Sequence, residues 1–216
     1  MIRIHRYIPA LLAVLVLHSA NAQAKHREES GFLDVFTFGI EGSYIGTVAS
    51  HRHFNFISSY GYRVDRKFTD TRYRSNGEFL MHIGANISDR FNLSLYTGKS
   101  GIGRYMLVTP LTLRGTYYFG KDPMKSRWLV YLDAGPGFSG SGNEISASGM
   151  FKAGTGYRIP LGKYTRLDFL ISYRNAMANK RVLGISSASS IYIAEENLRK
   201  NDALFFALTF GIGITF

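Results

Sequence analysis

The chain has 216 residues, enough for one domain after allowance for a leader but too few for two. It carries 26 Lys and Arg against 15 Asp and Glu, a formal net charge of +11, and it has no Cys. The absence of Cys excludes disulfides, thiolate nucleophiles and Cys-ligated metal sites together. In a cytoplasmic protein, a positive charge of this size would suggest binding to nucleic acid. The leader described next instead makes anionic lipid or polysaccharide the expected partner that balances this charge.

Residues 1–22 have the three parts of a secretory signal peptide. Arg3 and Arg6 come first, residues 8–17 are apolar, and small residues then allow cleavage after residue 22 or 24. The apolar run is too short for a spanning helix, which needs about 20 residues. No Cys follows the small residues, so the chain is not a lipoprotein. We therefore expect an exported protein with a short periplasmic N-terminal segment, residues 23–31, and a single domain, residues 32–216.

Apolar and polar residues alternate with period two through most of this domain, which predicts β-strands. In one segment, for example, Met81 and Ile83 lie on one face while His82 and Gly84 lie on the other. No apolar run near 20 residues follows residue 24, so a membrane-embedded form would have to be a barrel. The eight predicted strands cover residues 32–48, 78–87, 91–98, 106–119, 127–138, 145–159, 165–174 and 202–216.

The predicted connections alternate in length. Residues 88–90, 120–126 and 160–164 are short connections, whereas 49–76 and 176–201 are long and lie on the opposite side. The connections 99–105 and 139–144 on that side are moderate, so the pattern rests mainly on the two long ones. Transmembrane barrels have short periplasmic turns and longer extracellular loops, and an even strand number leaves both termini in the periplasm. Two points stay open. Aromatic residues at period two within 52–74 allow either longer flanking strands or two extra strands, and Pro110 requires a bulge or a later strand start.

The last segment, Asp202 to Phe216, has one bulky apolar face and one face of mostly small residues. With its terminal aromatic residue it resembles the closing strand of bacterial outer-membrane β-barrels. The chain is similar to the small OmpA/OmpX-type barrels and to barrel proteins common in Bacteroidetes. The resemblance implies an all-β, antiparallel, up-and-down transmembrane barrel of eight strands, or ten with the extra pair. It also implies that the barrel-assembly machinery reads Phe216. The alternative is a soluble lipocalin-like barrel with its apolar residues inside.

Polar side chains on the opposite strand faces would fill the lumen of such a barrel. An eight-stranded barrel is just wide enough for its side chains, so we expect these charges to pair and block the lumen. The alternative is a narrow pore in which ions move along the same groups. The predicted interior cluster comprises Glu41, Glu78, His82, Arg114, Asp133, Lys152, Arg158, Arg166, Asp168 and Arg174.

Signals for catalysis are weak. His82 and Glu78 share a strand face, but a nucleophilic Ser would have to come from an unknown pairing. The stretch from Ser172 to Ala176 faintly resembles the late-strand motif of lipid A deacylases, yet Ser172 and Arg174 stand where that motif has its His and Ser. We therefore expect no enzyme and no cofactor, with a lipid A-modifying acyl hydrolase as a second alternative.

The long connection 49–76 is basic and aromatic. Two acids, Asp65 and Asp70, stand among six aromatic residues and a larger set of cations. His51 and His53 share a face there, but two ligands do not make a metal site. Lipopolysaccharide phosphates, an acidic glycan or another protein would be natural partners at a cell surface, so we expect a structural or surface-interaction role. The candidate surface-binding residues are Arg52, Arg63, Arg66, Lys67, Arg72 and Arg74.

Overall fold

A computed structural model describes residues 35–58, 60–103, 106–141, 144–178 and 197–216. The predicted signal peptide, the segment 23–31 and most of the connection 176–201 lie outside these residues. Among the described residues, no helix is long and apolar enough to cross a membrane. The strands are β1 (Phe36–Ile57), β2 (Arg63–Asp70), β3 (Arg74–Ser88), β4 (Phe91–Ile102), β5 (Met106–Tyr118), β6 (Arg127–Ser141), β7 (Glu144–Pro160), β8 (Arg166–Ala178) and β9 (Leu198–Thr215).

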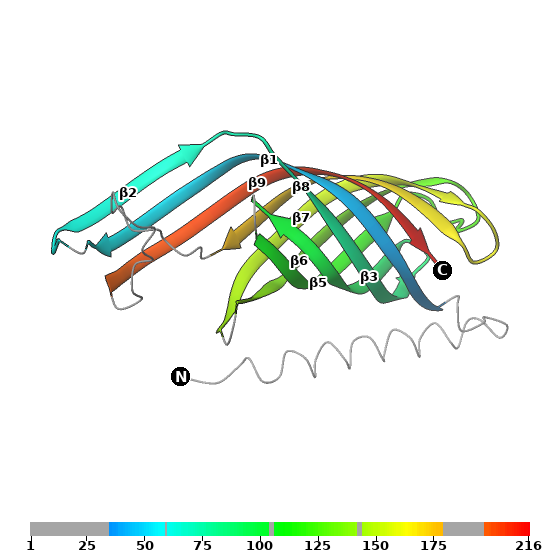
Figure 1. Cartoon of the computed structure of the whole chain (residues 1–216). Coiled ribbons are helices and arrows are strands. Elements are labelled where there is room, and N and C mark those ends of the chain that lie inside the picture. Colours follow the sequence, from blue (N-terminus) through cyan, green and yellow to red (C-terminus); the bar gives the residue numbers. More distant parts are fainter. Residues whose placement is uncertain (1–34, 59, 104–105, 142–143, 179–196) are drawn as a thin grey trace, which may run out of the picture.

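Eight of these strands close into an antiparallel barrel (Figure 1). Each of β3 to β9 pairs with the next strand in sequence, and β9 pairs with β1 to complete the circle. The pairing is staggered, as closure requires: neighbours followed once around the barrel from Thr37 return to β1 at Thr47. The predicted eight-stranded barrel is confirmed. The ten-stranded alternative is wrong, because β2 pairs with β1 outside the closed circle.

The outer surface of the barrel is apolar. Strand alternation turns bulky side chains outward, and Ile83 and Leu132 are 66% and 59% exposed, respectively. No second layer of the described chain covers this surface, which is the pattern of a barrel that contacts lipid. The lipocalin-like alternative is wrong, because it would need these side chains inside. The outward set includes Phe38, Ile40, Tyr44, Phe79, Met81, Leu95, Leu111, Leu113, Val130, Phe151, Phe169, Ile171, Tyr173, Leu208, Phe210 and Ile212.

One end of the barrel carries the three short turns, around residues 89–90, 119–126 and 161–165, and we call it the short-turn end. Phe216 closes the barrel here: its backbone N–H donates to the Phe38 carbonyl at 2.7 Å, and the two rings stack with centroids 5.2 Å apart. Trp128 and Tyr157 also face outward and contact each other edge to face at 5.1 Å. Aromatic rings at this level suit a membrane interface.

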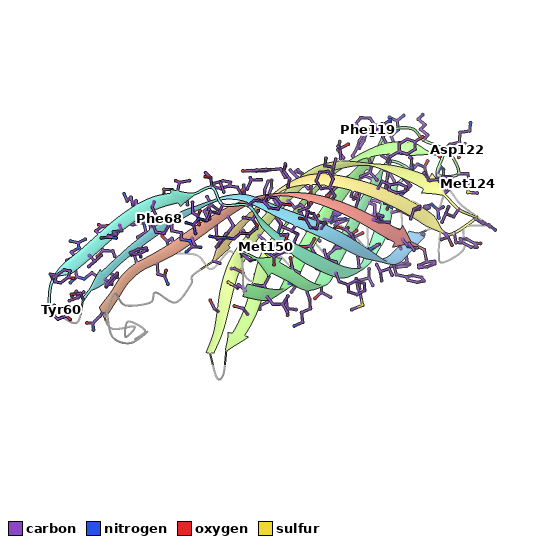
Figure 2. The ribbon with its side chains drawn as sticks, turned by 45° about the horizontal axis from the view of Figure 1, so that its top comes forward. Tyr60, Phe68, Phe119, Asp122, Met124 and Met150 are labelled. Carbon is purple, nitrogen blue, oxygen red and sulfur yellow. The ribbon has the colours of Figure 1, made fainter. Side chains whose placement is uncertain are left out.

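At the opposite end three strands continue beyond the barrel. Residues 50–57 of β1 pair with β2 on one side, and residues 50–56 pair with residues 198–205 of β9 on the other. We call this three-stranded sheet the arm; it projects away from the short-turn end (Figures 1 and 2). The alternative of longer flanking strands within 52–74 is therefore confirmed for β1, and the predicted connection 49–76 is not simply a loop. Most of it is an ordered hairpin, whose turn is closed by the Ser58 N–H donating to the Tyr62 carbonyl at 2.9 Å.

A bulge in β1 changes which side chains face inward on the arm. The register with β9 shifts between Thr47 and Ala49. Before the shift, Thr47 points into the lumen; after it, Ser50 does. Bulges commonly re-aim side chains in this way. As a result Phe54 lies on the inner face of the arm, and His53 lies on the outer face.

The prediction of a bulge or late start at Pro110 is wrong. β5 begins at Met106 and keeps one register with β4 on both sides of Pro110, from Leu111 opposite Thr97 to Val108 opposite Ser100. Pairing with β6 is interrupted for the two residues after Pro110 and resumes at Leu113 in the same register. The missing N–H donor thus coincides with a local gap in the ladder, and no residue has to be inserted.

Candidate functional site

The lumen is filled by charged side chains that the strand register places together. Four of them are direct cross-strand neighbours on consecutive strands, so they point inward at one level of the barrel. Their order around the wall, from β5 to β8, is Arg114, Asp133, Lys152 and Arg174. Glu41 on β1 and Glu78 on β3 reach the same level from the facing wall.

Arg114 lies at the centre of this level. Its Nε and Nη2 donate to Asp133 at 2.6 and 2.8 Å, and its Nη1 donates to Glu41 Oε2 at 2.5 Å. The guanidinium lies between two aromatic rings, 3.9 Å from the Tyr96 centroid and 4.4 Å from the Tyr131 centroid. Its side chain is only 4% exposed. A planar fork suits two carboxylates at once, so Arg114 ties β5 and β6 to β1 across the lumen.

Lys152 extends the same network. Its Nζ lies 2.5 Å from Glu78 Oε1, 3.7 Å from Glu41 and 3.9 Å from Asp133. The other oxygen of Glu78 accepts a hydrogen bond from Ser100 Oγ at 2.7 Å. Each buried carboxylate therefore has a cation and a neutral or second donor, which is the condition under which buried charges are tolerated.

Arg174 lies beside this network and toward the arm. Its Nη2 donates to Ser100 Oγ at 2.8 Å and its Nη1 to the Gly101 carbonyl at 3.0 Å. Its side chain is buried, and its link to Glu78 runs through the Ser100 hydroxyl. Beyond Arg174 the lumen becomes apolar. The buried cluster there comprises Ile102, Val108, Met150, Ala176, Ala178, Ala203 and Phe205.

A second ion pair lies toward the short-turn end. Arg158 donates twice to Asp168, from Nε and Nη2, both at 2.6 Å, and its Nη2 also contacts the Thr215 hydroxyl at 3.3 Å. The Tyr118 ring lies against both Arg158 and Arg127, at 4.6 and 4.0 Å from their guanidinium carbons. Tyr118 points into the lumen and is 3% exposed.

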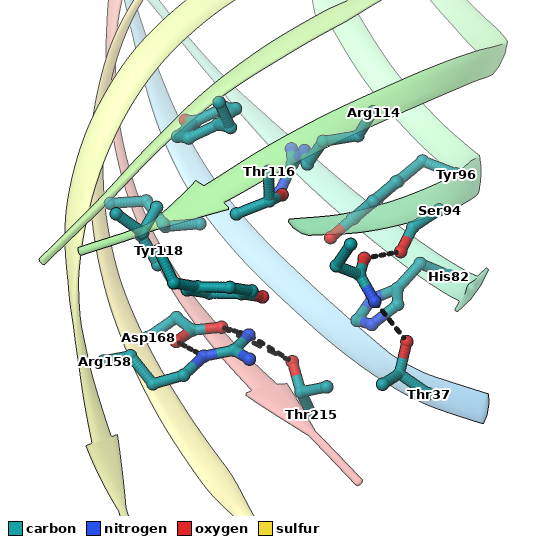
Figure 3. Close-up of a pocket in the computed structure, with 14 residues that line it drawn as sticks. Thr37, His82, Ser94, Tyr96, Arg114, Thr116, Tyr118, Arg158, Asp168 and Thr215 are labelled. Carbon is teal, nitrogen blue, oxygen red and sulfur yellow. Dashed lines mark hydrogen bonds and ion pairs between the residues drawn. The ribbon is translucent and has the colours of Figure 1, made fainter. Parts of the chain in front are cut away.

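Between the two levels is a polar cavity of about 20 Å³ (Figure 3). Its volume holds about one water molecule. His82 faces it and stacks on Tyr96 with ring centroids 4.7 Å apart. His82 Nδ1 has no hydrogen-bond partner in the described part of the chain. The other polar lining residues are Thr37, Asn92, Ser94, Arg114, Thr116, Tyr118, Tyr131, Arg158, Asp168 and Thr215.

The candidate catalytic residues do not meet. Glu78 binds Lys152 and Ser100, whereas His82 stacks on Tyr96. The two available serines bind other groups: Ser94 donates to an Asn side chain and Ser172 pairs with a Thr hydroxyl. Within the described ranges, no group of three or more His, Cys, Asp or Glu residues could hold a metal ion.

Arg166, predicted in the interior cluster, lies apart from it. The residue is half-buried at the start of β8, and its guanidinium donates to the backbone carbonyls of Tyr164 at 2.6 Å and Lys163 at 3.3 Å. It is the first residue of the strand and lies opposite the inward-facing Thr215, next to the turn, so it stays a predicted member of the interior cluster.

The acids of the arm are engaged by local partners. Asp65 Oδ1 lies 3.0 Å from His53 Nε2, and its Oδ2 accepts from Asn55 at 3.1 Å. Asp70 forms an ion pair with Arg74, and the Arg72 backbone N–H donates to its Oδ1 at 3.0 Å. This backbone hydrogen bond, helped by the nearby guanidinium groups, holds the pKa of the Asp70 carboxyl below its usual value.

The remaining cations of the arm divide into two groups. Arg63 lies 3.9 Å from Asp65, and the Arg52 guanidinium lies 5.8 Å from the Phe68 ring centre. Arg66 and Lys67 are exposed, and no carboxylate of the described residues forms an ion pair with either. They leave an uncompensated positive charge near the middle of β2.

Comparison with known proteins finds only remote structural similarity. No family model matches the chain, and no curated protein sequence matches it. The N-terminal β-barrel domain of OprF from Pseudomonas aeruginosa is 15% identical (TM-score 0.37) over 82% of this chain and 99% of that one. Neisserial surface protein A is 14% identical (TM-score 0.40) over 81% and 97%. The Escherichia coli outer membrane protease OmpT is 10% identical (TM-score 0.42) over 88% and 99%.

The strand pairing makes the protein a closed, eight-stranded antiparallel β-barrel, and its outer surface is apolar. At these identities the resemblance concerns the fold and carries no activity from any of these proteins to this chain.

Proposed function

We propose that this protein is an integral outer-membrane barrel that binds an anionic partner through its arm and that its lumen is a plug. The short-turn end, with Phe36 and Phe216, faces the periplasm, and the arm faces the outside. The contrast between three short turns and one extended arm supports this orientation. The C-terminal strand and Phe216 serve as the signal for the assembly machinery.

The observation that carries the proposal is the charge on the arm. Its acids already have partners, whereas Arg66 and Lys67 have none among the described residues. Because β1 is paired on both sides, the arm holds these cations at a fixed place beyond the barrel. Anionic groups of lipopolysaccharide, an acidic glycan or a protein surface fit such a site.

The lumen supports a structural role for its charges. A conducting path would need a continuous hydrated column, whereas the cavities beside Arg114 and Arg174 measure about 20 and 10 Å³ and each holds about one water molecule. The apolar cluster around Phe205 lies between the charged network and the arm. The separation of His82 from Glu78 likewise favours a protein without acyl-hydrolase chemistry over the deacylase alternative.

The test of this proposal is to shorten the arm. Replacing residues 53–67 by Asn-Gly joins Arg52 to Phe68, which are neighbours across the hairpin, through a two-residue turn. We expect the variant to fold but to lose at least about tenfold in affinity for dextran sulfate or for vesicles containing lipopolysaccharide, because several charge contacts are lost together. Binding is measured by fluorescence anisotropy for dextran sulfate and by co-sedimentation for vesicles.

A charge-matched control separates position from net charge. The shortened arm loses Arg63, Arg66, Lys67 and Asp65, three cations minus one acid, or two positive charges. Replacing Lys121 and Lys125 by Gln removes the same charge from the short-turn end and should leave binding within about twofold. Equal binding by wild type and the shortened variant, or no binding to either probe by wild type, would contradict the proposal.

A further inference from the structure

β2 is the terminal strand of the sheet. Its single neighbour in the described part of the chain is β1, so one edge of an eight-residue strand is unpaired outside the barrel. Figure 1 shows β2 on the outer side of the arm, with β1 between it and β9. An unpaired edge presents backbone donors and acceptors that another extended chain can use.

The hairpin turn fixes which backbone groups face that edge. The Ser58 N–H donates to the Tyr62 carbonyl, so this pair is of the hydrogen-bonded kind, and every second pair along the hairpin is of the same kind. Val64, Arg66 and Phe68 therefore direct their N–H and C=O groups at β1. Residues Asp65, Lys67 and Thr69, one step out of phase, direct theirs at the free edge.

The side chains along this edge combine free positive charge with an exposed apolar ring. Asp65 and Asp70 are engaged by partners within the arm, whereas Arg66 and Lys67 are not. Phe68 is 40% exposed on the inner face and contacts Phe54 edge to face at 5.8 Å. An added strand would thus meet free positive charge on both faces and an apolar surface next to it.

We propose that the β2 edge binds an extended acidic segment of a partner protein as an additional antiparallel strand. This inference rests on the proposed function and names the partner's chemistry. Direct cross-strand neighbours share a face, so the segment carries an apolar residue opposite Phe68 and acids opposite Lys67 and Arg66. Two positions further on, opposite Val64, a second apolar residue fits. Read from its N-terminus, the partner segment is therefore apolar, acidic, acidic, any residue, apolar.

A polypeptide strand suits this edge better than a glycan does. Asp65, Lys67 and Thr69 each offer one N–H and one C=O, repeated at the two-residue spacing of a strand. Another extended backbone matches that repeat group for group, and strand addition is a general mode of peptide recognition. Charged edges usually discourage pairing between like strands, but here the free charge has one sign and selects an acidic partner.

The test separates backbone pairing from charge at one position. Lys67→Gln removes the charge and keeps the N–H that faces the edge, whereas Lys67→Pro removes both and leaves the hydrogen bonds to β1 intact. The probe is the labelled peptide Thr-Val-Glu-Glu-Thr-Val-Thr, with Lys replacing both Glu residues in a control peptide. Affinity for the refolded full chain is measured by fluorescence anisotropy.

We expect wild type to prefer the acidic peptide over the control peptide. Lys67→Gln should weaken acidic-peptide binding about two- to fivefold. Lys67→Pro should weaken it about fivefold further, because one backbone hydrogen bond is lost. Equal affinities of the Gln and Pro variants, or no preference for the acidic peptide, would overturn the inference.

A measurement on wild type removes dependence on the folding of the Pro variant. Saturating peptide should slow amide hydrogen exchange at Asp65, Lys67 and Thr69. The exchange rates of the Val64 and Arg66 amides should stay unchanged. The same change in exchange rate at all of these amides would count against strand addition. The two proposals fail in different ways. If shortening the arm abolishes dextran sulfate binding but the Gln and Pro variants bind peptide equally, the arm is a binding site without strand addition.

Discussion

Replacing Arg114 by Met is expected to lower the free energy of unfolding by about 3–5 kcal/mol. Arg114 is the shared partner of Glu41 and Asp133, and all three side chains are at most 4% exposed. Removing the guanidinium leaves two buried carboxylates with Lys152 as their remaining cation, at 3.7 and 3.9 Å. Fluorescence of Trp128, which is the single tryptophan, reports unfolding during urea titration in lipid vesicles.

Two controls define this result. Arg66→Met removes an exposed arginine of the arm and should change stability by less than about 0.5 kcal/mol. Combining Arg114→Met with Glu41→Gln and Asp133→Asn should recover part of the loss, because the uncompensated buried charges are removed. A loss below about 1 kcal/mol for Arg114→Met alone would show that the network does not hold the barrel together.

Replacing Leu132 by Arg is expected to cost about 2–4 kcal/mol in a lipid bilayer, the cost of a cation at the midplane of a barrel's lipid face. Leu132 is 59% exposed on the outside of β6, and the adjacent Asp133 points into the lumen at the level of Arg114. The matched control is Thr69→Arg on the arm, where water surrounds the new side chain. Urea titration in vesicles measures both variants; equal stabilities would mean that the outer surface does not contact hydrocarbon.

The strands could be predicted from sequence because one physical rule governs each of them. Lipid on one side and a polar lumen on the other impose period-two alternation, so the predicted segment 106–119 coincides with β5 almost completely and 91–98 lies entirely within β4. The same alternation placed Glu41, Arg114, Asp133 and Lys152 on inward faces. Their placement followed from the alternation of side chains between the two faces of each strand, which can be counted without knowing which strand lies opposite.

The alternation of inward and outward residues within a strand could not predict which inward groups bind each other. Arg114 and Glu41 are 73 residues apart, and their contact depends on the stagger of the closed barrel. The pairing of His82 with Tyr96 instead of Glu78 depends on the register between β3 and β4. Both follow from hydrogen-bond registers that are set by the whole circle of strands.

The arm was the largest difference from expectation. Its strands carry four of the six predicted surface cations, Arg52, Arg63, Arg66 and Lys67. Sequence analysis treated this segment mainly as a loop. Phe54, Phe56, Tyr60 and Tyr62 at period two indicated extended strands there, and this possibility was left open. The bulge after Thr47 has no sequence signal that we recognise, so the exchange of faces along β1 became visible only in the structure.

The lumen and the arm divide the molecule into two parts with different chemistry. In the lumen, charges of both signs are buried and bound to each other across strands. On the arm, the acids are bound locally, whereas the exposed cations Arg66 and Lys67 of β2 and Arg199 of β9 have no ion pair among the described residues. The first arrangement favours a rigid, closed barrel, and the second favours contact with an outside partner.

The most direct test of this division is the conductance of the refolded protein in a planar bilayer, with a heat-shift gel to confirm that the inserted material is folded. We predict a silent bilayer for wild type, because the paired charges and the apolar cluster around Phe205 fill the lumen. Discrete current steps from folded wild-type protein, altered in size by Arg114→Met, would contradict the plug and would make the interior charges the lining of a channel.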